Sequence, residues 1–426
     1  MQGMFVFEGK VVKPPFVVRQ EAEKVFVNDV QVYPPVEVEE RPDLAKFGIE
    51  DVFSATERTA TLEKFGEVER ALEEFTSAKK EVWAEFKAAS FEQKSEEIKT
   101  FLEKKGYKTE FSANYQDVLV PVNEDFGIVA LFNEEARIQV MREAEEKYKP
   151  ETVLEIDVAK EMAEHIESNL EAGHFLRFEK NVIEAIPKEQ VDVIAEEVEK
   201  VEEVPWREIE YEQKVAKITE EVAKVRVIKR PCSAVIFFPH RSWQKEVVGR
   251  ASSYWFELGQ KLVAEGYWVR TYLDTAVTLN LWAGILAKGR DQNLRVIYNE
   301  GHGSDDIIYV GEPKLKKNWK YFRSSFVNKY AKLRNTIVYI HSCATMSDLK
   351  MARAFRGKGA CAYLGWQHPT SANPNYCDKI DALFWEPMID LHSTAIYAKK
   401  NVETVDKDLK GYGNRFCRIP IKKWEC

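Results

Sequence analysis

Five apolar runs in the second half of the chain decide its fold: SAVIFFP at 233–239, YWVRTYL at 267–273, LRVIYNE at 294–300, NTIVYIHS at 335–342 and ACAYLGW at 360–366. Patterns typical of helices separate these runs, at 245–265, 279–288, 324–333 and 348–355. Continuous apolar runs are typical of buried parallel strands, and strands that alternate with helices form right-handed crossover units. The sequence therefore predicts an α/β domain over 231–426, with an open, mostly parallel sheet flanked by helices.

A short repeat opens the chain. Residues 6–18 and 26–38 align at an offset of twenty, and each copy places a polar turn candidate between two apolar stretches before a Pro-Pro pair. The turn candidates are Glu8-Gly9 and Asn28-Asp29. Because Pro-Pro cannot continue a strand ladder, the pattern predicts two small β-hairpins. We therefore assign 1–50 to a β-hairpin repeat region.

Residues 51–230 are predicted to form an acidic, helix-rich α+β region. A long amphipathic helix or helical hairpin is expected first, then three short strands, a charged helix, and acidic helices around one more strand. The corresponding ranges are 56–105 for the helix or hairpin, 108–113, 117–122 and 127–132 for the strands, 133–148 for the charged helix, and 174–179 for the last strand. We find no chemical motif in this region.

The charge differs sharply between these parts. The chain has 62 Lys and Arg against 70 Asp and Glu, a net charge of -8. Residues 1–230 carry 52 acids and 33 bases, net -19, whereas the remainder carries 18 acids and 29 bases, net +11. All six cysteines and five of the seven histidines follow residue 230. We therefore expect an intramolecular contact between the acidic and basic halves, through which the first half regulates or targets the second.

The sequence also indicates in which cellular compartment the protein is expected. It has no run of about 18 or more uncharged apolar residues, so no membrane span is expected. The first residues, MQGMFVFEGKVVKPPF, lack the unbroken apolar stretch of a signal peptide. We expect a cytoplasmic protein, and the alternative is a secreted one whose signal was removed before this numbering begins. The cysteines permit disulfides without requiring them.

Two segments at predicted strand ends carry candidate chemistry. In open α/β sheets the reactive loops follow the carboxyl ends of the strands, and NEGHGSD at 299–305 and HSCAT at 341–345 lie there. Adjacent parallel strands lie about 4.8 Å apart, so His302 and Cys343 can come within hydrogen-bonding reach. Imidazole can take the thiol proton and return it to a leaving amine. The Gly303 amide, with that of Cys343, is a candidate oxyanion hole.

At these residues the sequence resembles the caspase-like (clan CD) cysteine peptidases, which include caspases, legumain, clostripain, gingipains, separase and the bacterial CHAT domains. These enzymes carry an apolar strand ending in His-Gly and a later one ending in Ala/Ser-Cys, here VIYNEGHGS and NTIVYIHSCAT, which looks most like the CHAT and gingipain-type versions. GACAYLGW resembles their strand after the nucleophile. The resemblance covers about residues 231–400. It implies a caspase-like fold, with Cys343 as nucleophile, His302 as general base and acid, and Gly303 as oxyanion donor.

Five residues are weaker candidates for binding substrate. His341 shares a strand face with Cys343 and is also an alternative base, ranked below His302. Several basic-specific relatives have Asp at this position, so its absence puts Arg/Lys specificity in doubt. Asp378, in the predicted loop after GW, is a candidate substitute, and His240-Arg241 could supply a positive wall. Trp366 is expected either to line the cleft or to pack in the core.

The sequence thus predicts a hydrolase, a thiol protease that cleaves polypeptide substrates through a thioester. Autoprocessing is expected in the exposed Lys-rich stretch over 314–323. The alternatives are a catalytically silent caspase-like binding or scaffold module, and a transpeptidase or acyltransferase that uses the same dyad. No metal site or cofactor is expected, and calcium activation is left open, although no motif indicates it. Nucleotide-binding loops are lacking, and nucleic acid is not an expected partner.

Overall fold

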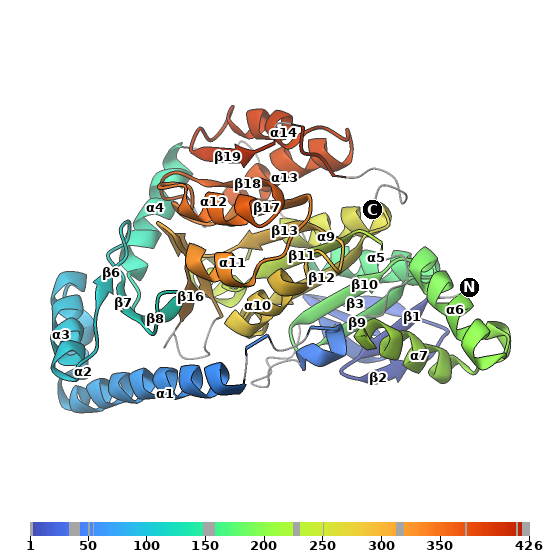
Figure 1. Ribbon diagram of the computed structural model, residues 1–426, viewed down its shortest axis with the longest axis horizontal. Coiled ribbons are helices and arrows are strands. Elements are labelled where there is room, and N and C mark those ends of the chain that lie inside the picture. Colours follow the sequence, from blue (N-terminus) through green and yellow to red (C-terminus); the bar gives the residue numbers. More distant parts are fainter. Residues whose placement is uncertain are drawn as a thin grey trace.

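The computed structural model describes residues 3–33, 43–49, 52–53, 55–147, 158–224, 231–249, 251–311, 319–370, 373–414 and 416–419. Its centre is a mixed, mostly parallel ten-stranded sheet with the order β19-β18-β17-β13-β11-β12-β10-β9-β1-β2 (Figure 1). Five neighbouring strands run parallel: β12 (Trp268–Leu273), β11 (Ser233–Phe238), β13 (Leu294–Glu300), β17 (Thr336–His341) and β18 (Ala360–Trp366). These are the five predicted strands, so the α/β prediction is confirmed.

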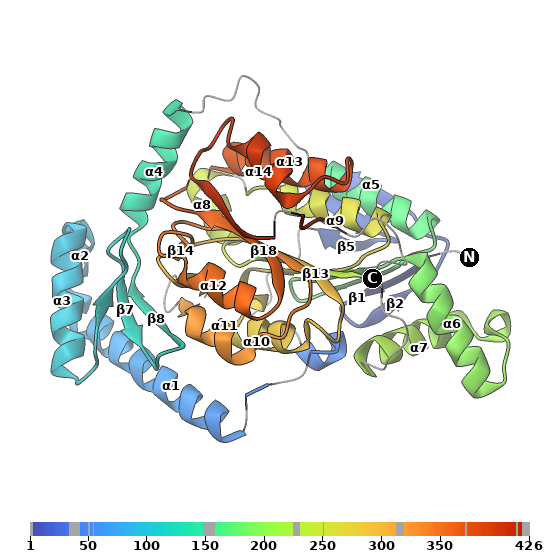
Figure 2. The same cartoon turned by 45° about the horizontal axis from the view of Figure 1, so that its top comes forward.

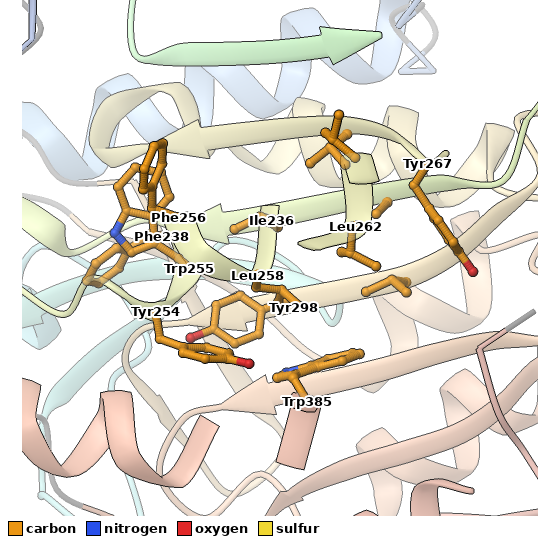
Figure 3. Close-up of a cluster of buried hydrophobic side chains, with 14 of the residues drawn as sticks. Ile236, Phe238, Tyr254, Trp255, Phe256, Leu258, Leu262, Tyr267, Tyr298 and Trp385 are labelled. Carbon is orange, nitrogen blue, oxygen red and sulfur yellow. The ribbon is translucent and has the colours of Figure 1, made fainter. Parts of the chain in front are cut away.

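Helices cover both faces of this sheet (Figure 2). One face carries α9 (Tyr254–Ala264), α13 (Pro374–Ile389) and α14 (Ala395–Val402), and the other carries α10 (Leu279–Lys288), α11 (Ser324–Tyr330) and α12 (Lys350–Gly357). Consecutive strand residues supply opposite cores, because side chains alternate across a strand. Ile236 packs with Leu258 and Leu262 of α9 (Figure 3), whereas Phe237 belongs to the core on the other face.

The predicted helix over 245–265 is wrong. The chain forms two helices there, α8 (Arg241–Val248) and α9. Gly249 ends α8 with a φ of 88°, a left-handed conformation that glycine adopts without a steric penalty, and its N–H donates to the carbonyl of Lys245.

The first 230 residues extend the same sheet. The strands β10 (Val182–Ile186), β9 (Phe175–Glu179), β1 (Met4–Phe7) and β2 (Lys10–Val12) continue it beyond β12. Arg177 of β9 faces Glu184 of β10, and the two buried side chains form an ion pair of 2.6 Å. The helices α5 (Val158–Glu171), α6 (Lys188–Glu202) and α7 (Tyr211–Lys224) accompany these strands. The net charge changes sign at residue 230, but one continuous sheet contains strands from both sides of that position.

The opening repeat gives two hairpins, as predicted, but in different sheets. β1 and β2 form the first, and β4 (Lys24–Val27) and β5 (Val30–Tyr33) form the second, beside β3 (Val18–Glu21). All four turn residues, Glu8, Gly9, Asn28 and Asp29, have positive φ, which suits the twist of a two-residue hairpin. Residues 34–38 of the repeat lie outside the described residues.

A second, antiparallel sheet joins the two halves of the chain. Its order is β14 (Gly303–Ser304), β15 (Ile307–Val310), β16 (Lys320–Phe322), β8 (Phe126–Leu131), β7 (Val118–Pro121) and β6 (Glu110–Phe111). The last three strands were predicted, and the first three were not. The helices α1 (Ala55–Ala78), α2 (Trp83–Ala88) and α3 (Phe91–Lys104) precede β6, and α4 (Glu134–Lys147) follows β8. The loop carrying His302 thus enters a sheet to which each half of the chain contributes three strands.

Ion pairs also cross between the halves. Arg323 contacts Glu110 at 2.7 Å, and Lys320 contacts Glu69 at 3.5 Å. Both basic residues belong to the Lys-rich stretch, whose members Lys314, Lys316 and Lys317 lie outside the described residues. Partly exposed pairs of this kind contribute little stability, so the shared sheets dominate the association.

Two further features concern the chain as a whole. Cys361 of β18 forms a disulfide with Cys417, which ties the C-terminal segment beside β19 (Leu409–Gly413) to the sheet edge. Within the described residues, none of the helices is long and apolar enough to cross a bilayer.

Candidate active site

A small enclosed cavity lies at the carboxyl ends of the parallel strands. Numbered from β11, the five parallel strands have the order 2-1-3-4-5, so the topological switch point lies between β11 and β13, where open α/β sheets bind ligands. About 30 Å³ of the cavity is open to the centres of water molecules. Its lining comes from the segments that follow β11, β13, β17 and β18: Phe238, His240, Trp243, Gln244, Glu300, Gly301, His302, His341, Cys343, Thr370 and Cys377. The candidates His302, His341 and Cys343 are therefore brought together.

Cys343 follows β17 and is 6% exposed. Its Sγ lies 2.9 Å from the Tyr115 hydroxyl, accepts a hydrogen bond from the Thr370 amide at 3.3 Å, and lies 3.4 Å from the Thr370 carbonyl. Burial raises the pKa of the thiol above its ordinary value, although Tyr115, Thr370 and the charge of Arg137 act to lower it. The resting group is thus a neutral thiol at neutral pH.

The rings of four side chains surround the His302 imidazole. The ring centroids of Trp243, His240, Phe132 and Trp319 are 4.4, 4.5, 5.0 and 5.1 Å from its own. Burial lowers its pKa well below the ordinary value, and the neighbouring His240 and Arg137 lower it further. Its Nε2 is buried and has no hydrogen-bond partner among the described residues. The imidazole is therefore neutral and can accept a proton.

Two glycines let the His302 loop approach its neighbours. A Cβ at Gly303 would lie 2.9 Å from the Cβ of Ser342, which precedes Cys343. A Cβ at Gly301 would lie 2.9 Å from Nδ1 of His240, which accepts a hydrogen bond from the His302 amide at 3.0 Å. The absence of side chains on both sides of His302 thus brings the loop after β13 against the loops after β11 and β17. The oxyanion role of Gly303 stays a prediction.

His341 occupies a polar environment. Its Nδ1 lies 2.9 Å from Asp381 of α13, and its ring stacks on Trp366 at 4.3 Å. Burial acts to lower the pKa of His341, but the Asp381 carboxylate outweighs it and raises the pKa overall. Asp381 also accepts hydrogen bonds from Tyr298 and Tyr339, at 2.6 and 2.7 Å. Trp366 itself is fully buried behind His341 and is not among the residues that line the cavity.

Glu300 lines the cavity and forms a buried acidic pair with Asp381, which does not. Burial and the nearby Asp381 raise the pKa of Glu300. The Tyr298 hydroxyl, which binds Asp381, also lies 3.0 Å from Glu300. Sequence reasoning did not select either carboxyl. Glu300 could have been found from its place at the end of a predicted strand, whereas Asp381 gave no signal because it lies in a helix 40 positions beyond His341.

Asp378 and Arg241 do not line the cavity among the described residues. The prediction that Asp378 lies in a loop is wrong, because it belongs to α13, where it is buried. Its carboxylate accepts hydrogen bonds from the amides of Ser253 and Tyr254 at 2.8 and 2.9 Å and so caps the start of α9. Arg241 is the first residue of α8 and lies 3.7 Å from Asp274.

The first half of the chain also contacts Cys343, which sequence reasoning missed. Tyr115, between β6 and β7, contacts the sulfur of Cys343 across 228 sequence positions. Behind it, the buried Arg137 of α4 binds Asp117 through two hydrogen bonds of 2.9 and 2.7 Å. Sequence analysis found no chemical motif in residues 51–230, and neither Tyr115 nor Arg137 belongs to one.

Comparison with known proteins adds no family to this picture. No protein-family model matches the chain, and no curated protein matches it either. The site is therefore interpreted from its own geometry: a neutral thiol, a neutral imidazole and an ion-paired imidazole around one enclosed cavity.

Proposed function

We propose that this protein is a caspase-like cysteine endopeptidase with Cys343 as nucleophile and His302 as general base and acid. One observation carries the proposal: both residues line a single buried cavity at the carboxyl ends of the adjacent strands β13 and β17, at the switch point of the sheet. A thiol and an imidazole in this relation are the parts that acyl transfer requires.

The two pKa shifts favour proton transfer during attack over a preformed ion pair. As Sγ of Cys343 attacks the substrate carbonyl, Nε2 of His302 takes the thiol proton. The tetrahedral intermediate collapses to a thioester, the C–N bond breaks, and His302 returns the proton to the leaving amine. Water then loses a proton to His302 and attacks the thioester, which releases a carboxylic acid and restores the thiol. In this proposal the Gly303 amide donates to the oxyanion.

His341 has a separate part in the proposal. Its Nδ1 is held by Asp381, and its Nε2 is buried, without a hydrogen-bond partner among the described residues, and belongs to a residue that lines the cavity. Its raised pKa favours the protonated form, which cannot serve as a base, so we assign His341 to the wall that receives a substrate side chain. Its charge favours a hydrogen-bond acceptor on the substrate.

The catalytically silent module is the second candidate, and the size of the cavity favours it. The present space admits about one water, because Tyr115 and Thr370 cover the sulfur. A peptidase of this geometry has to open before it binds a polypeptide. Regarding location, the Cys361–Cys417 disulfide supports the alternative of an oxidising compartment over the cytoplasm.

The test is digestion of an unfolded protein by the full chain. Wild type should cleave it, Cys343→Ala and His302→Ala should not, and Cys377→Ala is the matched control because Cys377 is the other buried cysteine outside a disulfide among the described residues. Added amine nucleophiles distinguish hydrolysis from transfer. Cleavage that survives in Cys343→Ala, or none by wild type with and without calcium, would contradict the proposal and favour the silent module.

A further inference from the structure

The Tyr115 hydroxyl is one of two donors that meet the sulfur of Cys343. It lies 2.9 Å from Sγ, and the Thr370 amide lies 3.3 Å from the same atom. In the neutral pair either Tyr115 or Cys343 can be the donor. Once the thiol has lost its proton, sulfur can only accept, so the hydroxyl must donate to it. A hydrogen bond to an ionised partner is stronger than one between neutral groups.

Tyr115 is held rigidly in this position. It is 3% exposed, and its carbonyl accepts a hydrogen bond of 2.8 Å from Nδ2 of Asn133. The turn that carries it is closed by Ser112 and Asp117, whose backbone groups are hydrogen-bonded at 2.9 Å. The Arg137 guanidinium lies 3.9 Å from the centre of the Tyr115 ring. The phenol is therefore packed in place for the sulfur and does not swing freely.

Arg137 connects Tyr115 to the proposed base. Its guanidinium also lies 3.9 Å from the ring centre of Phe132, and Phe132 packs on His302. Its charge lowers the pKa of both Cys343 and His302. It thus favours a thiolate at the first group and a neutral imidazole at the second. Asp117 fixes the guanidinium, with both side chains almost fully buried.

We propose that Tyr115 is a further catalytic residue, which donates a hydrogen bond to the Cys343 thiolate as His302 removes the thiol proton, with Arg137 as its positioning residue. No proton leaves Tyr115 in this step; the charge that forms on sulfur is stabilised by the hydroxyl. The inference rests on the proposed role of Cys343 as nucleophile. It also means that the nucleophile's environment is incomplete without the first half of the chain.

Other titratable groups face the same cavity and have to be kept constant in the test. They are His240, Glu300, His302, His341 and Cys377, together with Asp117 beside Arg137. Tyr115→Phe leaves all of them in place and keeps the ring that Arg137 contacts. Tyr321→Phe is the matched control, since Tyr321 is a fully buried tyrosine of β16, in the sheet that also contains β6 and β7 on either side of Tyr115.

The experiment measures the rate of iodoacetamide alkylation of Cys343 against pH in the full native chain, by peptide mapping, with Cys377 as an internal reference. In Tyr115→Phe the midpoint of the profile should move up by about one pH unit, which lowers the rate about tenfold below the midpoint. Tyr321→Phe should match wild type. Thermal unfolding of each variant confirms that it folds.

Two results would overturn the inference. Faster alkylation at every pH with an unchanged midpoint would mean that Tyr115 only covers the sulfur, and an unchanged profile would mean that it does not act on the thiolate at all. Alkylation does not require peptide hydrolysis, so failure of the proposed function is seen separately. In that case the midpoint shifts as expected while wild type cleaves no substrate.

Discussion

Two buried histidines line the same cavity: His302 just after β13, and His341 at the end of β17. Their electrostatic environments are opposite. His302 is surrounded by rings, and burial lowers its pKa; His341 is held by Asp381, which raises its pKa in spite of burial. Both imidazoles line the same cavity as the thiol, but their pKa values are shifted in opposite directions. The neutral form accepts a proton, so these shifts favour His302 as the base and His341 as a wall residue.

The largest expected effect is on turnover. His302→Ala should lower kcat/KM by about 10²- to 10⁴-fold, the usual contribution of a general base, because it removes the imidazole that takes the thiol proton in the proposed mechanism. His341→Gln should lower it less and mainly through KM. The measurement is steady-state cleavage of an unfolded protein or a library-derived peptide. A larger loss of kcat in His341→Gln than in His302→Ala would reverse the assignment.

The next effect is on stability at the ion pair. Asp381→Asn should lower the free energy of unfolding by about 3–5 kcal/mol, because it leaves His341 without its carboxylate and replaces one of the two oxygens that accept tyrosine hydroxyls by a nitrogen that cannot accept. Urea unfolding near pH 6 measures this. Asp390→Asn is the control at the end of the same helix. There the pair with Lys261 is partly exposed, and the change should stay below about 1 kcal/mol.

The smallest effect is a difference in pH dependence. His302 has a folded pKa below 6.5, so acidification below 6.5 protonates the unfolded chain first and costs up to about 1.4 kcal/mol per pH unit. His302→Gln should remove this loss. For His341, whose folded pKa lies above 6.5, the contribution is fully present below 6.5 and is lost as pH rises through the folded pKa. His341→Gln should therefore change the slope only above 6.5.

Urea unfolding at about pH 8, 6.5 and 5.5 separates the two variants. The pH dependence of the free energy of unfolding should differ from wild type only between about pH 5.5 and 6.5 in His302→Gln, and only between about pH 6.5 and 8 in His341→Gln. Equal slopes for both variants across the whole range would show that the two environments do not differ as described.

Much of this site was predictable from the sequence, because its histidines and cysteine lie at the ends of strands that are mostly apolar. Strands buried on both faces need only a continuous apolar run, and LRVIYNE and NTIVYIHS provide one each. The short strands β14 to β16 were not predictable, since two to four residues are too few to establish a period. β16 is also defined by pairing with β8, almost 200 residues earlier.

The side chains that contact Cys343 and His341 could not be predicted either, because they lie far from these residues in the sequence. Tyr115 and Asp381 are ordinary members of a turn and a helix, and only the tertiary fold brings them to Cys343 and His341. The charge difference between the halves suggested two parts of different chemistry. In the structure, strands from both halves join in two sheets, and each half supplies one block of neighbouring strands to each sheet, since pairing depends on backbone groups and not on net charge.

The central claim is that Cys343 attacks substrate with His302 as its base. It is tested most directly with a peptidyl acyloxymethyl ketone, which labels a cysteine peptidase covalently, applied to wild type, His302→Ala and His341→Ala and followed by mass spectrometry. The account predicts an adduct at Cys343 in wild type and in His341→Ala, and none in His302→Ala. An adduct in His302→Ala together with its loss in His341→Ala would contradict it.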